Sequence, residues 1–210
     1  MKRSFAACFF LTLFASCVAP LNTSYESARM LGKGETELTG SYTHYTVSSE
    51  GESDAINNNY GVRLGFGFND IFNLKLRYER LAPTSEDASG VNYIDIAPKF
   101  QIVKGKIAGT LPLGLYFDGD DSEFVLSPKF IFTYPANDKF EVSLATKADI
   151  FPGDVDNVYL GFNLGLGISS DLNRWAIRPE AGLMIDPGES GAYWAFGVGI
   201  VGVIPGRNGR

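Results

Sequence analysis

The chain offers few side chains that could perform catalysis. His44 is the only histidine among 210 residues, and it lies between Thr43 and Tyr45 in a stretch rich in Ser, Thr and Tyr. A histidine base works beside a nucleophile or a carboxylate that orients it. A lone histidine in such a stretch is more typical of a hydrogen-bonded structural residue, so we predict that the protein is not an enzyme. Catalysis through His44 is the alternative.

Two further patterns could bind a metal ion or a phosphate group. Residues 118–123 gather carboxylates of the kind that calcium prefers, but they lack the spacing of the twelve-residue calcium loop. Residues 65–67 and 165–167 have the sequence Gly-x-Gly, without the third glycine and the following helix of a phosphate-binding loop. We therefore predict a solvated acidic loop, strand glycines, no metal site and no cofactor.

The N-terminus carries the features of an export signal. Lys2-Arg3 precedes an apolar stretch at 5–14, which is typical of a secretory signal peptide and too short to span a bilayer as a helix. The small residues before Cys17 resemble the processing box of bacterial lipoproteins. This resemblance implies a signal peptide over 1–16 and lipid attachment at Cys17. Ordinary signal-peptidase cleavage within 15–19 is the alternative.

The rest of the chain has the period of β-strands. In 73–79 and 140–150, uncharged apolar side chains occupy alternate positions, and Lys, Arg, Asp, Glu and Ser occupy most positions between them. Because successive strand side chains point to opposite faces, one face of the sheet is apolar and the other is charged. Most strands are long enough to cross a bilayer at a tilt. We expect ten strands, at about 36–47, 58–69, 72–82, 91–103, 106–117, 123–134, 138–150, 157–169, 174–185 and 191–204.

Short and long connections alternate along this pattern. The tight turns lie at 69–70, 104–105, 135–138 and 170–173. The acidic or Gly-rich connections lie at 48–57, 82–90, 118–122, 152–156 and 186–191. Membrane β-barrels place short turns in the periplasm and longer loops outside the cell. An even strand number then returns both ends of the barrel to the periplasmic side.

The chain therefore resembles the small outer-membrane β-barrel proteins, in particular those of the lipoprotein-like kind. The features that carry the resemblance are the Cys17 box and the strand sequences at 60–70, 73–79 and 159–168. It implies an all-β, antiparallel, up-and-down transmembrane barrel of ten strands, with eight as the alternative. The expected parts are the signal peptide, a periplasmic tether at 17–35, the barrel at 36–204 and a tail at 205–210. The expected location is the outer membrane of a Gram-negative bacterium.

Four prolines conflict with regular strands. Proline cannot donate to a strand ladder, and a closed barrel has no free edge. We expect bulges that bend the strands around a narrow barrel, with a partly open sheet as the alternative. The four are Pro98, Pro112, Pro128 and Pro179.

The orientation of the two faces decides the role. If the apolar face meets lipid, the charged side chains line the lumen, where they need partners. They are Arg63, Lys75, Arg77, Glu79, Asp95, Lys99, Lys129, Glu141, Lys147, Asp149, Arg178 and Glu180. We predict that they pair into a network that plugs the lumen of a barrel with a structural or interaction role.

Two other functions stay open. One is a narrow channel for small polar or anionic solutes, lined by Arg63, Arg77, Lys99 and Lys129. The other is a soluble, lipocalin-like barrel with the apolar face around an apolar ligand. The formal net charge of −6 and the absence of a basic cluster argue against a nucleic-acid partner. The expected partners are outer-membrane lipid and lipopolysaccharide, with envelope protein partners unknown.

Overall fold

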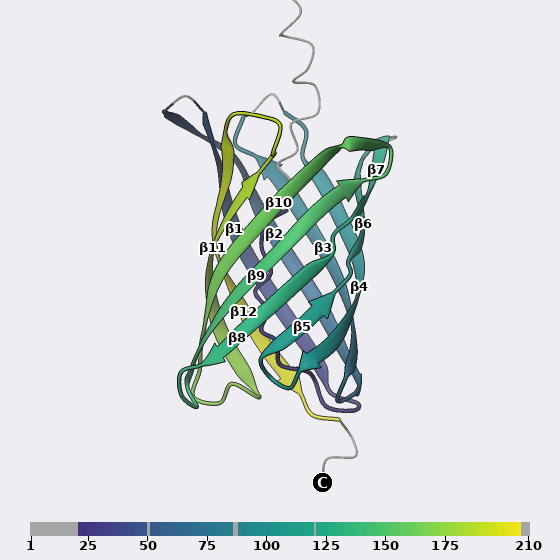
Figure 1. The fold of residues 1–210 in the computed structure, drawn as a ribbon, viewed down its shortest axis with the longest axis vertical. Coiled ribbons are helices and arrows are strands. Elements are labelled where there is room, and N and C mark those ends of the chain that lie inside the picture. The colour runs from purple at the N-terminus through teal and green to yellow at the C-terminus, as the bar shows by residue number, and fades with distance from the viewer. Residues whose placement is uncertain (1–20, 50, 86–87, 120, 207–210) are drawn as a thin grey trace, which may run out of the picture.

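The computed structural model describes residues 21–49, 51–85, 88–119 and 121–206, so the expected signal peptide and Cys17 lie outside the described residues. One antiparallel sheet closes into a barrel, because β1 pairs with β12 (Figure 1). The described part of the chain has no helix long and apolar enough to cross a membrane. The strands are β1 (Thr36–Ser49), β2 (Glu52–Asn69), β3 (Phe72–Pro83), β4 (Val91–Val103), β5 (Ile107–Thr110), β6 (Leu113–Asp118), β7 (Asp121–Leu126), β8 (Lys129–Pro135), β9 (Phe140–Phe151), β10 (Asp154–Ile168), β11 (Trp175–Ile185) and β12 (Ala192–Ile204).

The twelve strands make ten passes of the barrel wall. β5 and β6 are two halves of one pass and both pair with β4, while β7 and β8 are two halves of another and both pair with β9. The predicted ten-strand antiparallel barrel is thus confirmed, and the eight-strand alternative is wrong.

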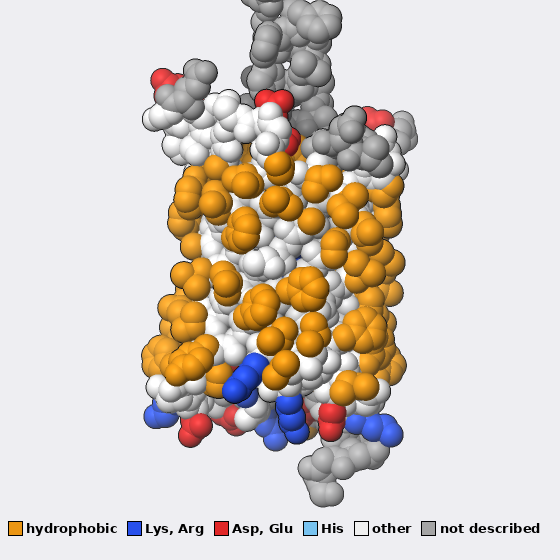
Figure 2. Space-filling model, viewed as in Figure 1, with side chains coloured by type: hydrophobic (Ala, Val, Ile, Leu, Met, Phe, Trp, Pro, Cys, Tyr) orange, Lys and Arg blue, Asp and Glu red, His pale blue; other side chains and the backbone are white. Residues whose placement is uncertain are grey.

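The apolar face of the sheet is the outer face. On β3, Leu76 and Tyr78 are 39% and 46% exposed, whereas Lys75 and Glu79 are 3% and 0% exposed. Figure 2 shows hydrophobic side chains over the visible side of the barrel and charged ones gathered at its two ends. The lipocalin-like alternative placed the apolar side chains inside, and that orientation is wrong. This arrangement is the one in which an apolar band meets lipid.

The prolines interrupt strands but leave the barrel closed. Pro112 separates β5 from β6, and Pro128 lies between β7 and β8. At these two positions the strands are irregular, as the sequence predicted. Pro98 and Pro179 instead lie within β4 and β11, although the β10–β11 pairing skips the residues opposite Pro179. The carbonyls of three of these prolines still accept main-chain hydrogen bonds at 3.0–3.1 Å. The donors are the N–H groups of Leu111 to Pro98, of Ser127 to Pro112 and of Ala148 to Pro128. The partly open sheet is therefore wrong.

The segment before β1 lies inside the barrel. We expected 17–35 as a periplasmic tether, but residues 21–28 and Leu31 are buried in the lumen, which Figure 1 shows as the purple trace within the ribbon. We call residues 21–31 the lumen segment. Its sequence lacks the period of a strand, yet it can be buried because side chains of the wall satisfy its main chain.

Candidate functional site in the barrel lumen

Charged side chains from six strands converge on the lumen. All twelve charged residues named from the sequence lie on the inner side of the wall, and all but Asp95 and Lys147 are fully buried. Both exceptions are half-buried. The strands fix their inward direction because each side chain occupies an alternate position of its strand.

Wall side chains accept hydrogen bonds from the main chain of the lumen segment. Buried N–H groups need partners, and this extended chain pairs with no strand. Six N–H groups bond to the wall: Leu21 to the Tyr116 hydroxyl at 3.0 Å, Asn22 to the Tyr45 hydroxyl at 2.8 Å, Ser24 and Tyr25 to the Glu180 carboxylate at 2.6 and 2.7 Å, Ala28 to Thr133 at 2.8 Å, and Leu31 to Asn73 at 2.9 Å.

Cationic and amide side chains donate to the carbonyls of the same segment. The bonds are from Lys147 to Leu21, from Arg77 to Thr23 at 3.1 Å, from Arg63 to Ser24, from Lys99 to Ser27 and Arg29 at 2.6 and 3.1 Å, from Gln101 to Ala28 at 3.2 Å, and from Asn73 to Leu31 at 3.2 Å. The lumen charges therefore do more than pair with one another. They replace the strand partners that the segment lacks.

Glu26 lies at the centre of this arrangement. Its carboxylate is 3.3 Å from Arg63 Nη1, 3.2 Å from Lys75 Nζ, 3.6 Å from Lys99 Nζ and 3.3 Å from Lys129 Nζ. We call these four side chains the cation cluster. Sequence reasoning missed Glu26. A signal was present, because seven positive charges against five negative ones left the predicted lumen short of acidic partners.

A second group of ion pairs lies within the wall. Lys147 pairs with Asp149 at 2.7 Å, and Arg77 pairs with Glu79. Glu141 holds Arg178 of the wall and Arg29 of the lumen segment, each at 2.6 Å. The predicted network among wall charges thus exists in part, and Arg29 extends it to the segment.

Inward glycines make room for the segment. A Cβ atom on Gly182 would lie 2.7 Å from the carbonyl oxygen of Asn22, and one on Gly199 would lie 2.8 Å from Cβ and Cγ of Tyr25. Gly67 would likewise meet the carbonyl of Gly32. The wall therefore approaches the segment closely where it carries no side chain, which accounts for glycines of the kind expected from the sequence.

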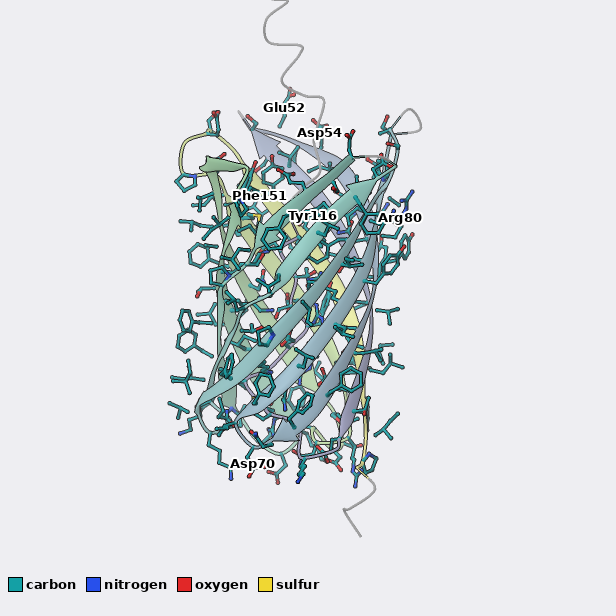
Figure 3. All side chains as sticks on the ribbon, turned by 90° about the vertical axis from the view of Figure 1, so that its right-hand side faces the viewer. Glu52, Asp54, Asp70, Arg80, Tyr116 and Phe151 are labelled. Atoms are coloured by element: carbon teal, nitrogen blue, oxygen red, sulfur yellow. The ribbon has the colours of Figure 1, made fainter. Side chains whose placement is uncertain are left out.

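The segment runs from the long-loop end of the barrel to the short-turn end. Leu21 packs in an apolar cluster with Tyr45, Tyr93, Tyr116 and Phe151. Figure 3 shows Tyr116 and Phe151 towards the end that carries Glu52 and Asp54, and Asp70 at the opposite end.

At the short-turn end, the chain after the lumen segment pairs with β2. Gly34 donates to the Gly67 carbonyl at 2.8 Å, and Gly67 donates to the Glu35 carbonyl at 2.9 Å.

The space around the segment is uneven: a pocket of ≈ 240 Å³ lies beside residues 29–32 at the short-turn end, and two cavities further inside the lumen are smaller. A cavity of ≈ 20 Å³ lies beside Glu26 and the cation cluster, and one of ≈ 70 Å³ lies near Met30 and Leu31. The first holds about one water molecule. The second is also lined by Glu26.

Solved structures share this architecture, although no family model and no curated protein matches the sequence. An outer-membrane channel from Pseudomonas putida F1 is 11% identical with a TM-score of 0.53, and the match covers 87% of this chain and 100% of that chain. The attachment invasion locus protein Ail of Yersinia pestis is 10% identical with a TM-score of 0.38, over 82% of this chain and 99% of that chain. This chain has the fold of an outer-membrane β-barrel. At such identities the likeness shows the fold alone.

His44 lies on the outer face of this outer-membrane barrel fold, away from the lumen. Its Nδ1 is 2.9 Å from Oδ1 of Asn58, which also accepts a hydrogen bond from the Tyr42 hydroxyl at 2.8 Å. This is the hydrogen-bonded structural arrangement that the sequence favoured. That the protein is not an enzyme stays a prediction.

In the acidic stretch, Asp118 ends β6 and residues 121–123 begin β7. Asp118 accepts a hydrogen bond from Ser89 at 2.5 Å. Among the residues that the structure describes, no three His, Cys, Asp or Glu side chains are grouped to hold a metal ion.

Proposed function

We propose that the protein is an exported barrel of the Gram-negative outer membrane, lipidated at Cys17, with a lumen closed by its own N-terminal segment. Its role is structural or in interactions at the envelope, and its apolar belt contacts outer-membrane lipid and lipopolysaccharide. The observation that carries the closed lumen is Glu26, which lies within 3.2–3.6 Å of four cations from the wall.

Closure follows from the number and kind of these contacts. Withdrawal of the segment would break the ion pairs of Glu26 and Arg29 together with the main-chain bonds to the wall. Arg63, Lys99 and Lys129 would then lose the only acid among the described residues with which they pair, whereas Lys75 would keep Glu37 and Glu141 would keep Arg178. Buried charges without partners are strongly destabilising. The segment is therefore expected to stay in the lumen in the absence of another ligand.

Conductance tests the closed lumen. The purified full-length protein, reconstituted in a planar bilayer, should show no large stable current. Stable channels on the nanosiemens scale would contradict closure. Resistance to carbonate extraction and a heat-modifiable gel mobility would report membrane insertion and a closed barrel independently of conductance.

Labelling tests the lipid. Cells grown with a radioactive fatty acid should incorporate the label into the wild type and not into Cys17→Ser. Equal labelling of both proteins, or labelling of neither, would remove the lipoprotein part of the proposal and leave the barrel part intact.

A second candidate function is a narrow channel for small anionic solutes. Among the described residues, Glu26 is the only acid that forms an ion pair with Arg63, Lys99 and Lys129. A lumen without the segment would therefore carry an excess of positive charge, which attracts anions. Such a channel would need a displaced segment, and spontaneous current from the wild type would favour it.

A further inference from the structure

The cation cluster belongs to the wall, whereas its partners belong to the lumen segment. Arg63 pairs with Glu26 and donates to the Ser24 carbonyl. Lys129 pairs with Glu26 and donates to the Ser24 hydroxyl at 3.0 Å.

The same holds for Lys99, which pairs with Glu26 and donates to the carbonyls of Ser27 and Arg29. Lys75 differs, because it also pairs with Glu37 of β1 at 2.8 Å. Three of the four cations thus depend on the segment for every polar contact described above.

Four different strands hold the cluster. Arg63 lies on β2, Lys75 on β3, Lys99 on β4 and Lys129 on β8, and each of these strands is paired on both sides. Strand pairing fixes where each side chain starts, so the backbone positions of the four cations depend on the wall rather than on the segment.

The cluster matches the shape of one carboxylate. Oε1 of Glu26 pairs with Arg63 and Lys129, and Oε2 pairs with Lys75 and Lys99. Each oxygen thus faces two cations. Oε2 is buried and accepts no hydrogen bond, so its two contacts are ion pairs alone. Glu26 is therefore bound at this oxygen by charge rather than by a hydrogen bond, as any other carboxylate of similar size could be.

We propose that Arg63, Lys75, Lys99 and Lys129 form a carboxylate-binding site of the lumen wall. Glu26 occupies this site in cis, and the carboxylate of an acidic solute occupies it when Glu26 is absent. The proposal deepens the proposed closure, since it names what can compete with the segment that closes the lumen. The expected ligands are small organic carboxylates, because the site holds two oxygens and little free volume surrounds it.

Chemical rescue tests this site. Glu26→Ala in the full-length protein removes the carboxylate and leaves a space that acetate can fill. The readout is the midpoint of heat-induced unfolding, followed by gel mobility in detergent. Glu26→Ala should unfold at a lower temperature than the wild type. Acetate at a hundredfold excess over its Kd should raise the midpoint by roughly 5–10 °C.

The controls separate a specific site from a salt effect. Neutral acetamide should leave the midpoint of Glu26→Ala unchanged, and chloride at equal ionic strength should raise it less than acetate does. Arg29→Ala is the matched variant, because it also removes a charged side chain of the segment that pairs with the wall. Acetate should not rescue it, since the lost group is a cation.

Two outcomes would overturn the proposal. One is a Glu26→Ala barrel that responds to acetate no more than to chloride, and the other is an equal response of Arg29→Ala. If Glu26→Ala does not fold in chloride, the folded fraction after refolding in each salt is compared instead. A higher folded fraction in acetate alone supports the site, and equal fractions in all salts contradict it.

This experiment is distinguishable from the test of closure. If the wild type conducts but acetate rescues Glu26→Ala, the carboxylate site stands and the closed lumen falls. If the wild type is silent and acetate has no effect, the lumen is closed but the site does not exchange its carboxylate.

Discussion

Tyr25 lies directly against Gly199 of β12, where a Cβ atom on the glycine would come within 2.8 Å of Cβ and Cγ of the tyrosine. Tyr25 also has a φ of 49°, which a non-glycine residue rarely adopts. Its hydroxyl is 2.6 Å from the Thr43 hydroxyl, and the Glu180 carboxylate accepts its N–H. The wall therefore holds Tyr25 in an unfavourable conformation through contacts on several sides.

A side chain at position 199 should disturb the packing of the segment. Gly199→Val would collide with Tyr25, and such overpacking costs about 1–3 kcal/mol. We expect the midpoint of heat-induced unfolding, followed by gel mobility, to fall by roughly 2–12 °C. Gly202→Val is the control, because a Cβ at that position meets no atom within 4 Å. A Gly199→Val protein that unfolds at the wild-type temperature would contradict the close packing of segment and wall.

Glu180 should control the mobility of the segment. Its two oxygens accept the N–H groups of Ser24 and Tyr25 at 2.6 and 2.7 Å. In Glu180→Gln the amide NH₂ would face one of these donors, so a hydrogen bond to a charged group worth roughly 1.5–3 kcal/mol would be lost. Hydrogen exchange at the two amides should accelerate roughly 10–100-fold. The control is Glu189→Gln on an exposed loop, which should leave the exchange rates unchanged. Unchanged exchange rates in Glu180→Gln would show that Glu180 does not hold the segment.

Reversal of the charge at position 26 should expel the segment. Glu26→Lys would place a fifth cation among four that lie 3.2–3.6 Å from the present carboxylate. Because like charges at such distances repel strongly in a buried site, the lumen should open and carry anions. The reversal potential in a potassium chloride gradient measures this selectivity. Glu189→Lys should stay silent, and a cation-selective current from Glu26→Lys would be incompatible with the proposed lumen.

The direction of the segment predicts the sidedness of the N-terminus. Leu21 lies at the long-loop end, and the four residues back to Cys17 reach at most about 14 Å. A lipid on Cys17 would then lie on the loop side of the membrane. Glu52→Cys and Asp70→Cys, which lie at opposite ends, test the sidedness (Figure 3).

In intact cells, a membrane-impermeant maleimide should label Glu52→Cys at once and Asp70→Cys only after lysis. The reverse pattern would place the long loops, and with them the N-terminal side of the lumen segment, in the periplasm.

The barrel could be predicted from the sequence because its signal is local. Strand β4 occupies 91–103, as expected, since alternate residues must face lipid and lumen in turn. The burial of the lumen segment could not be predicted in this way, because its partners are side chains that lie far away in the sequence. Glu180, for example, lies 155 residues from Tyr25. No periodicity marks such contacts. Only the excess of lumen cations and the inward glycines indicated that something else fills the barrel.

Hydrogen exchange of the full-length wild type, followed by mass spectrometry, tests the central claim most directly. Peptides that cover residues 21–31 should exchange far more slowly than an unstructured chain, because six of their N–H groups are bonded to wall side chains and most of the segment is buried. Exchange at the rate of an unstructured chain, with the strands still protected, would show that the segment lies outside the lumen.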